Sequence, residues 1–93
     1  MELQINIYEY LKIYHVGEKN AVMSKELENA FGCKGTELRR AINGLRCQGK
    51  PICSCNKGYY YAASQTEIKN TVKNLEMRVS AITSAIEGLR GWC

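Results

Sequence analysis

Proline is scarce in this sequence, and long apolar runs are missing. The 93 residues include one Pro, one Trp, one Phe and one His, while 45% are apolar and 24% are charged. This composition excludes a low-complexity disordered chain and predicts one small globular unit. No segment approaches about 18 consecutive apolar residues, so we expect no membrane-spanning helix. A core of this size is marginal alone, which favours a partner that buries more apolar surface.

A signal peptide is also missing, because the start, MELQINIYEY, lacks the order of basic and then apolar residues. We therefore expect a cytoplasmic protein. Its five cysteines are odd in number, which favours reduced thiols over a disulfide framework. Cys33, Cys47, Cys53 and Cys55 are separated by 13, five and one residues, unlike paired C-x2-C zinc knuckles. We expect these four cysteines to act as small apolar packing residues, with Cys33 and Cys47 beside the core helices. We expect them to bind no metal.

Catalytic motifs are missing as well. His15 is the single histidine, and no nucleophile and base pairing or Gly-rich phosphate loop is recognisable. We predict that the protein is not an enzyme and takes no cofactor. His15 is expected to be a helix-terminal or packing residue.

Positive charge is concentrated in the middle of the chain. Residues 1–32 hold three basic and five acidic residues, residues 33–61 hold six and one, and residues 62–93 hold four and three. The middle segment alone has a net charge of plus five, which indicates a polyanionic partner. A merely solvated cationic face is the alternative.

Apolar periodicity predicts three helices before residue 50. Leu3, Ile7, Leu11 and Tyr14 recur at helical spacing over the first fifteen residues, and Gly17 ends that helix. The segment NAVMSKELENAFG predicts a short second helix with Ser24 as its N-cap and a glycine stop. The segment TELRRAINGLRCQ predicts a third. Its inward-facing residues are expected to be Leu38, Ala41, Ile42 and Leu45.

The segment PICSCNKGYYYA predicts a β-hairpin directly after the third helix. Pro51 opens the first strand, where a missing N–H is tolerated. Asn56, Lys57 and Gly58 are residue types that accept positive φ at a turn. Tyr60 alternates with its two tyrosine neighbours across the second strand, so we expect at least one face to cover the core.

The stretch SKELENAFGCKGTELRRAINGLRCQGKPICSCNKGYYYA resembles the winged helix-turn-helix of bacterial and bacteriophage DNA-binding proteins, including the N-terminal domain of biotin operon repressors. Those proteins share a Ser-x-x-Leu helix, a recognition helix ending in IxxLRxxG, and a PI strand followed by GYY. The resemblance spans roughly residues 5–62 and implies a mainly α fold with a small β-hairpin wing (α+β). We expect residues 63–93 to hold no ligand-binding or catalytic domain of the repressor type.

The resemblance also implies that the third helix reads double-stranded DNA. Arginine pairs with guanine and asparagine with adenine, while residues at the helix start and the wing hold phosphates. Glu37 either reads cytosine or favours the positive end of the helix dipole. The candidate DNA-binding residues are Lys34, Thr36, Arg39, Arg40, Asn43, Arg46, Lys50 and Lys57.

The final third predicts one long amphipathic helix. Ser64 and Glu67 form an S-x-x-E capping box, and residues 1–63 and 64–93 are expected to be the two parts of the chain. Seven apolar residues follow at alternating spacings of four and three, a coiled-coil pattern. We expect a homodimer through this seam, and the alternative is a helix folded back over the first helix. The seam comprises Ile68, Val72, Leu75, Val79, Ile82, Ile86 and Leu89.

Together these features predict a dimeric DNA-binding protein, either a small transcriptional regulator or a phage protein. Winged helices also dock proteins in replication and transcription, so an adaptor without specific DNA readout is the rival interpretation. A thiol or metal sensor is a third.

Overall fold

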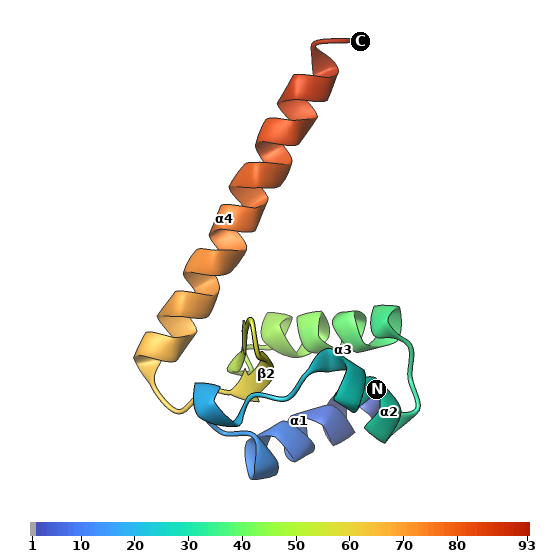
Figure 1. Cartoon of the computed structure of the whole chain (residues 1–93), viewed down its shortest axis with the longest axis vertical. Helices are drawn as coiled ribbons and strands as arrows, with labels where there is room; N and C mark the ends of the chain where they lie inside the picture. The colour runs from blue at the N-terminus through green and yellow to red at the C-terminus, as the bar shows by residue number, and fades with distance from the viewer. Residues whose placement is uncertain (1) are drawn as a thin grey trace.

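The computed structural model describes residues 2–93, and Met1, which the expected first helix and domain include, lies outside them. Figure 1 shows a compact domain from which one long helix projects. This arrangement confirms the expected fold class, mainly α with a two-stranded hairpin and a long C-terminal helix. The elements are α1 (Glu2–Tyr14), η1 (Glu18–Asn20), α2 (Ser24–Phe31), α3 (Gly35–Cys47), β1 (Ile52–Cys55), β2 (Gly58–Tyr61) and α4 (Gln65–Arg90).

The core lies where α1, α2 and α3 meet under the hairpin. All four residues expected on the inner face of α3 are buried, which confirms that interpretation of its periodicity. Tyr14 was expected on the inner face of α1 but is exposed, because the helix ends there and its ring packs on Tyr10 instead. The buried cluster consists of Ile7, Leu11, Val22, Leu27, Leu38, Ala41, Ile42, Leu45 and Ile52.

The hairpin is held along both edges of its second strand. Strand β1 pairs antiparallel with β2 in the register Cys53 to Tyr60. On the other edge, Val22 and Tyr59 exchange two backbone hydrogen bonds of 2.9 and 2.8 Å. Further along, the Gly17 N–H donates to the Tyr61 carbonyl oxygen. The hairpin therefore gains a third, short partner strand from the link between α1 and α2.

Glycine is required at the hairpin turn. Gly58 has a φ of +121°, and an added Cβ would collide with the backbone carbonyl of Val22. Among the described residues only glycines adopt positive φ, so of the three turn residues expected to accept it only Gly58 does. The turn bends at Asn56 and Lys57 with ordinary backbone angles, and Gly58 alone carries the left-handed conformation.

Helix α2 begins one residue earlier than its sequence pattern indicated. Met23 is the N-cap, and Ser24 is the first helical residue, so the expectation of Ser24 as N-cap was wrong. Met23 has no side-chain acceptor for the free N–H groups of the first turn. At the other end Gly32 adopts the left-handed conformation, as its place after the helix predicted.

The start of α4 is fixed by its capping residues. Ser64 Oγ accepts a hydrogen bond from the Glu67 N–H at 3.3 Å, which confirms Ser64 as the N-cap. The Glu67 carboxylate in turn accepts the N–H groups of Glu18 (2.9 Å) and Ala63 (2.7 Å). These hydrogen bonds hold the pKa of Glu67 below its ordinary value. One side chain thus ties α4 to η1.

Beyond its first turns α4 leaves the domain. Thr71 is its one buried residue among those described, and Ile68 and Leu75 are half-buried against the hairpin side. Figure 1 shows the remainder projecting away from α1, so the helix does not fold back over α1. At about 1.5 Å per residue its 26 residues span about 39 Å. No helix within residues 2–93 contains an 18-residue stretch apolar enough to cross a membrane.

We predict that Gly58→Ala destabilises the domain by at least ~2 kcal/mol, because the new Cβ would press the hairpin off Val22 in a strained backbone conformation. Gly88→Ala is the control, since its Cβ would meet nothing within 4 Å in a helix. That change should stabilise α4 by about 0.5–1 kcal/mol. Urea unfolding of both variants measures the difference, and equal stabilities would contradict the proposed close approach.

Candidate nucleic-acid interface

The outward face of α3 is polar and positively charged. Thr36, Arg39, Arg40 and Asn43 are all exposed, on the side opposite the buried residues of the same helix. They follow the spacing i, i+3, i+4 and i+7, which places them on one face. The structure therefore brings these four predicted residues together.

The start of α3 holds two further candidate residues, Lys34 and Glu37. Lys34 is the N-cap position, exposed, and its N–H donates to Glu37 Oε1 at 2.9 Å. Of the two interpretations of Glu37, this contact supports a capping role at the positive end of the helix. The Lys34 ammonium group stands at the same end as Thr36.

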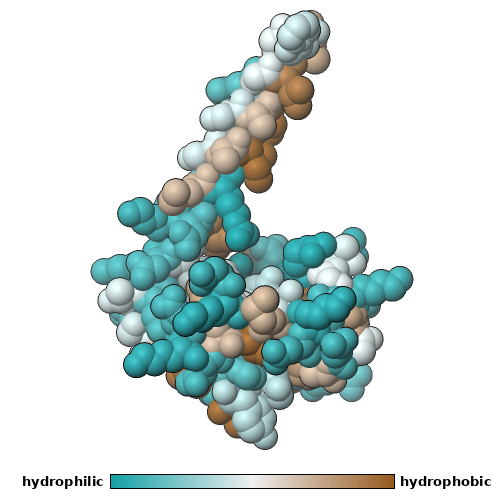
Figure 2. Space-filling model, in the orientation of Figure 1, coloured by the Kyte–Doolittle hydropathy of each residue, from teal (hydrophilic) through white to brown (hydrophobic). Residues whose placement is uncertain are grey.

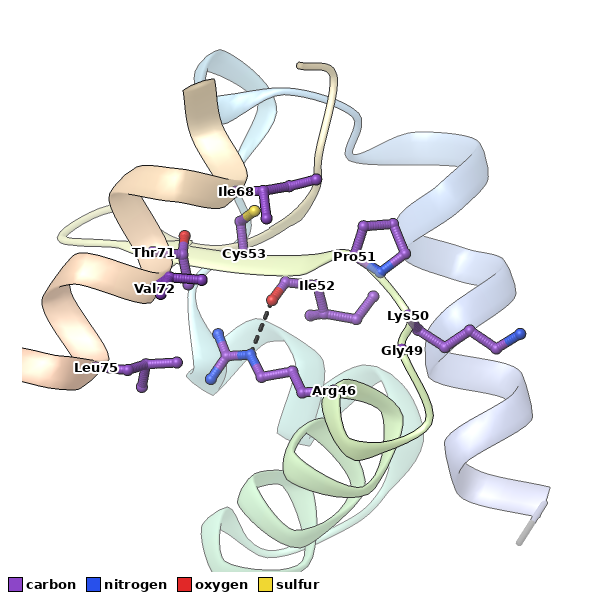
Figure 3. A pocket seen from close by; sticks show the side chains of 10 residues that line it. All are labelled: Arg46, Gly49, Lys50, Pro51, Ile52, Cys53, Ile68, Thr71, Val72 and Leu75. Atoms are coloured by element: carbon purple, nitrogen blue, oxygen red, sulfur yellow. Dashed lines mark hydrogen bonds between the residues drawn. The ribbon is translucent and has the colours of Figure 1, made fainter. Parts of the chain in front are cut away.

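The two other predicted lysines occupy different environments. Lys57 is exposed at the hairpin tip. Lys50 instead lies against α1, with its Nζ 5.1 Å from the centre of the Tyr8 ring, and Figure 3 shows its side chain directed toward that helix. Lys12 approaches the same ring at 5.6 Å. Both ammonium groups are at cation–π distance from Tyr8. The position of Lys12 beside the same ring as Lys50 was not predicted, because no local sequence pattern links residues 12 and 50.

Arg46 is a structural residue. Its Nε donates to the Ile52 carbonyl oxygen at 2.8 Å and its Nη2 to Ser54 Oγ at 3.0 Å. These two hydrogen bonds attach β1 to α3. Figure 3 shows the guanidinium group between α3 and α4 under this strand. Burial lowers the pKa of Arg46, and the positive charge of Arg78 lowers it further. Arg46 therefore does not belong to the exposed face of α3 that could contact DNA bases.

The tyrosines and cysteines of the hairpin mainly serve packing. Tyr60 is 2% exposed, and burial raises its pKa to about 12. Its partner across the strands, Cys53, is also buried, and burial raises the pKa of this thiol. A base cannot stack on a ring covered to this extent. These residues lie between the hairpin and α4, where the hydroxyl of Thr71 accepts the Ser54 N–H at 3.4 Å.

The other cysteines and the histidine have separate positions. Cys33 is half-buried beside the core, where burial and the charges of Glu37 and Glu28 raise its pKa. Cys47 is exposed, so its expected place beside the core was wrong. His15 Nδ1 is 2.7 Å from the Asn20 carbonyl oxygen, and its ring packs on Tyr10, as expected for a packing residue. Within residues 2–93 no three His, Cys, Asp or Glu side chains converge on a common point.

The apolar seam of α4 divides into a covered and an uncovered part. Ile68 and Leu75 line a cavity of about 290 Å³ beside Pro51 and β1. Farther along, Val79, Ile82 and Leu89 are 63%, 60% and 71% exposed. Figure 2 shows apolar side chains in a line along one edge of the projecting helix. Val72 and Ile86 are about half exposed. Within residues 2–93 no other element covers this stripe.

No family model matches the chain, and no curated protein or solved structure matches it either.

We predict that Arg46→Ala lowers the stability of the protein by about 1–3 kcal/mol in the absence of any ligand, because the buried Ile52 carbonyl and Ser54 hydroxyl lose a charged donor. Arg39→Ala removes the same side chain from the exposed face and should change stability by less than ~0.5 kcal/mol. Thermal and urea unfolding measure both. Equal effects would mean that Arg46 does not support the hairpin.

Proposed function

We propose that this protein is a winged helix-turn-helix protein that binds double-stranded DNA as a homodimer in the bacterial cytoplasm. The observation that carries the proposal is the exposed polar face of α3, whose inner face is fully occupied by the core. A helix of this kind, followed at once by a hairpin, is the arrangement in which a recognition helix enters the major groove and a wing contacts the flanking backbone.

The four residues of the outward face of α3, Thr36, Arg39, Arg40 and Asn43, each match a chemical group of DNA. The guanidinium groups of Arg39 and Arg40 can pair bidentately with guanine, and the amide of Asn43 with adenine. Lys34 and Thr36 stand at the start of the helix, where backbone phosphates are usually held. Lys57 extends from the wing tip and adds a sequence-independent phosphate contact. The net charge of plus five in residues 33–61 favours the same partner.

The uncovered seam of α4 favours a second copy of the same chain as its partner. Residues Val79, Ile82, Ile86 and Leu89 repeat at spacings of three, four and three, so two such helices can interlock their side chains. Val72, Val79 and Ile86 occupy equivalent positions of the repeat and are all β-branched, which suits a parallel pair of helices, whereas Ile68 and Ile82 at the other set of positions weaken that preference. Parallel pairing would place both α3 helices at the same end of the assembly.

A dimer of this form suits DNA binding. Figure 1 shows α4 rising on the side of the domain where α3 lies, so a duplex along α3 would have α4 beside it. Two linked recognition helices bind two half-sites with a high effective concentration, whereas one domain binds one half-site. The same seam is also the feature that supports the rival function, an adaptor whose α4 docks another protein.

We predict that affinity for DNA falls steeply with salt concentration. Lys57→Ala should weaken binding to all sequences and reduce the slope of log affinity against log salt by about one. Arg40→Ala and Asn43→Ala should instead relax the preference at individual bases by about 1–3 kcal/mol each. Selection from a random duplex pool, followed by titrations at several salt concentrations, measures both effects.

Lys19→Ala is the control for these titrations, because Lys19 is exposed in η1 and outside the candidate interface. It should leave base preference unchanged. A wild-type protein that selects no sequence and binds no duplex at low salt would overturn the DNA-binding proposal and favour the adaptor.

We predict that Ile82→Asp combined with Ile86→Asp makes the protein monomeric, because a dimer would bury two unpaired charges per helix. Both residues are exposed in the single chain, so the domain should keep its stability. Leu75 is left intact because it packs on the chain's own hairpin side. Sedimentation at several concentrations measures the change.

Ser84→Asp is the matched control, since Ser84 lies on the same helix but off the seam. It should stay dimeric. A short thiol-reactive crosslinker should join two copies through Cys93 if the helices are parallel, and Cys93→Ser should prevent this while Cys47→Ser should not. A wild-type protein that sediments as a monomer at tens of micromolar would contradict the dimer.

A further inference from the structure

A second, more polar cavity lies on the side of the hairpin that faces α2. Its volume is about 250 Å³, and it is lined by the start of α2, the hairpin turn, α3 and the fourth turn of α4. Two arginines, Arg46 and Arg78, line it together with neutral polar side chains. No acidic residue is among the described residues that line it. The polar lining residues are Ser24, Arg46, Ser54, Asn56, Tyr59 and Arg78.

The two guanidinium groups come from helices that are far apart in the sequence. Arg46 is held in place by the Ile52 carbonyl and Ser54, so it cannot swing away from the cavity without losing these hydrogen bonds. Arg78 is close enough that its charge lowers the pKa of Arg46, after the larger effect of burial. Two like charges facing one polar cavity repel each other unless an anion lies between them.

The backbone adds further donors at the same place. Met23 provides no side-chain cap, and the first helical residue of α2, Ser24, lines the cavity. The Met23 carbonyl oxygen accepts the N–H groups of Glu26 and Leu27, which are the first hydrogen bonds of α2. The N–H groups of Ser24 and Lys25 come before these and are available as donors at the helix start. The positive end of the helix dipole adds to the field of the two arginines.

We infer that this cavity binds a phosphoryl group. A guanidinium group forms paired hydrogen bonds with phosphate oxygens, and hydroxyl groups such as those of Ser24 and Ser54 complete the coordination. A chloride ion is a poorer match, because it cannot accept paired bonds from two planar guanidinium groups. The phosphoryl group is carried either by a small free phosphate compound or by the backbone of bound DNA.

Occupation of the cavity would hold α4 against the DNA-binding domain. Arg78 belongs to α4, whereas Arg46 and Ser24 belong to α3 and α2. An anion shared by these residues replaces the repulsion between the arginines by two attractions. The bound anion would therefore fix the direction of α4, the helix that we propose as the dimer contact, relative to the hairpin.

Inorganic phosphate tests the inference on the full chain without DNA, so the result is independent of the proposed DNA binding. Phosphate should raise the melting temperature saturably, relative to sodium chloride at equal ionic strength. In ¹⁵N–¹H spectra the amide signals of Ser24, Lys25 and Ser54 should shift with the same affinity. A wild-type protein without a saturable response overturns the inference.

Variants of Arg78 locate the effect, since this side chain is exposed and its replacement is expected to leave the fold intact. Arg78→Gln should weaken phosphate binding by about tenfold or more, because one charged donor is lost. Arg78→Glu should raise the melting temperature in phosphate-free buffer, by pairing with Arg46, and abolish the phosphate response. Arg90→Gln, with the same loss of charge on the same helix, should bind like the wild type. Equal affinities of Arg78→Gln and Arg90→Gln would also overturn the inference.

A DNA titration in phosphate-free buffer separates the two sources of the phosphoryl group. If Arg78→Gln binds DNA as tightly as the wild type, the cavity serves a small phosphate compound. If the variant binds DNA about tenfold more weakly, and inorganic phosphate competes with DNA for the wild type, the cavity holds a backbone phosphate.

Discussion

The pairing of Val22 with Tyr59 is the interaction on which the rest of this structure depends. It attaches the hairpin to the link before α2 through two backbone hydrogen bonds, and it requires Gly58 beside it. Because of this pairing, the start of α2 lies next to the hairpin turn, and both lie close to α3. The position of the hairpin tip relative to α3, and hence any joint contact with DNA, follows from the same attachment.

Arg46 shows how one residue type serves two purposes in a basic segment. The concentration of positive charge in residues 33–61 indicated a polyanionic partner, and most of these charges are indeed exposed. The guanidinium group of Arg46, however, supports β1 and faces Arg78 across a polar cavity. Charge in this protein is therefore distributed between an outer face on α3 and an inner position beside α4. Only the former belongs to the proposed recognition surface.

Much of the fold could be predicted from periodicity, because the inner faces of α1 and α3 repeat at helical spacing and their buried residues match the pattern. The cap of α4 was equally clear from Ser64 and Glu67. The N-cap of α2 was predicted wrongly, because a serine near a helix start suggests an N-cap, whereas here Met23 is the N-cap and Ser24 is the first helical residue. Cys47 was misplaced because a thiol carries little information on burial.

The sequence by itself determined the order of helices and strands, the inner face of α3 and the apolar seam of α4, since each depends on local spacing. Tertiary structure decided which basic residues remain free. Lys50 lies against Tyr8, and Arg46 donates a hydrogen bond to β1. These contacts join segments that no local sequence pattern connects. Tertiary structure also decided that the apolar contacts of α4 with the domain end at Leu75, because the hairpin offers an apolar surface to the first turns of α4 alone. Packing between distant segments, unlike periodicity, is set by the whole chain.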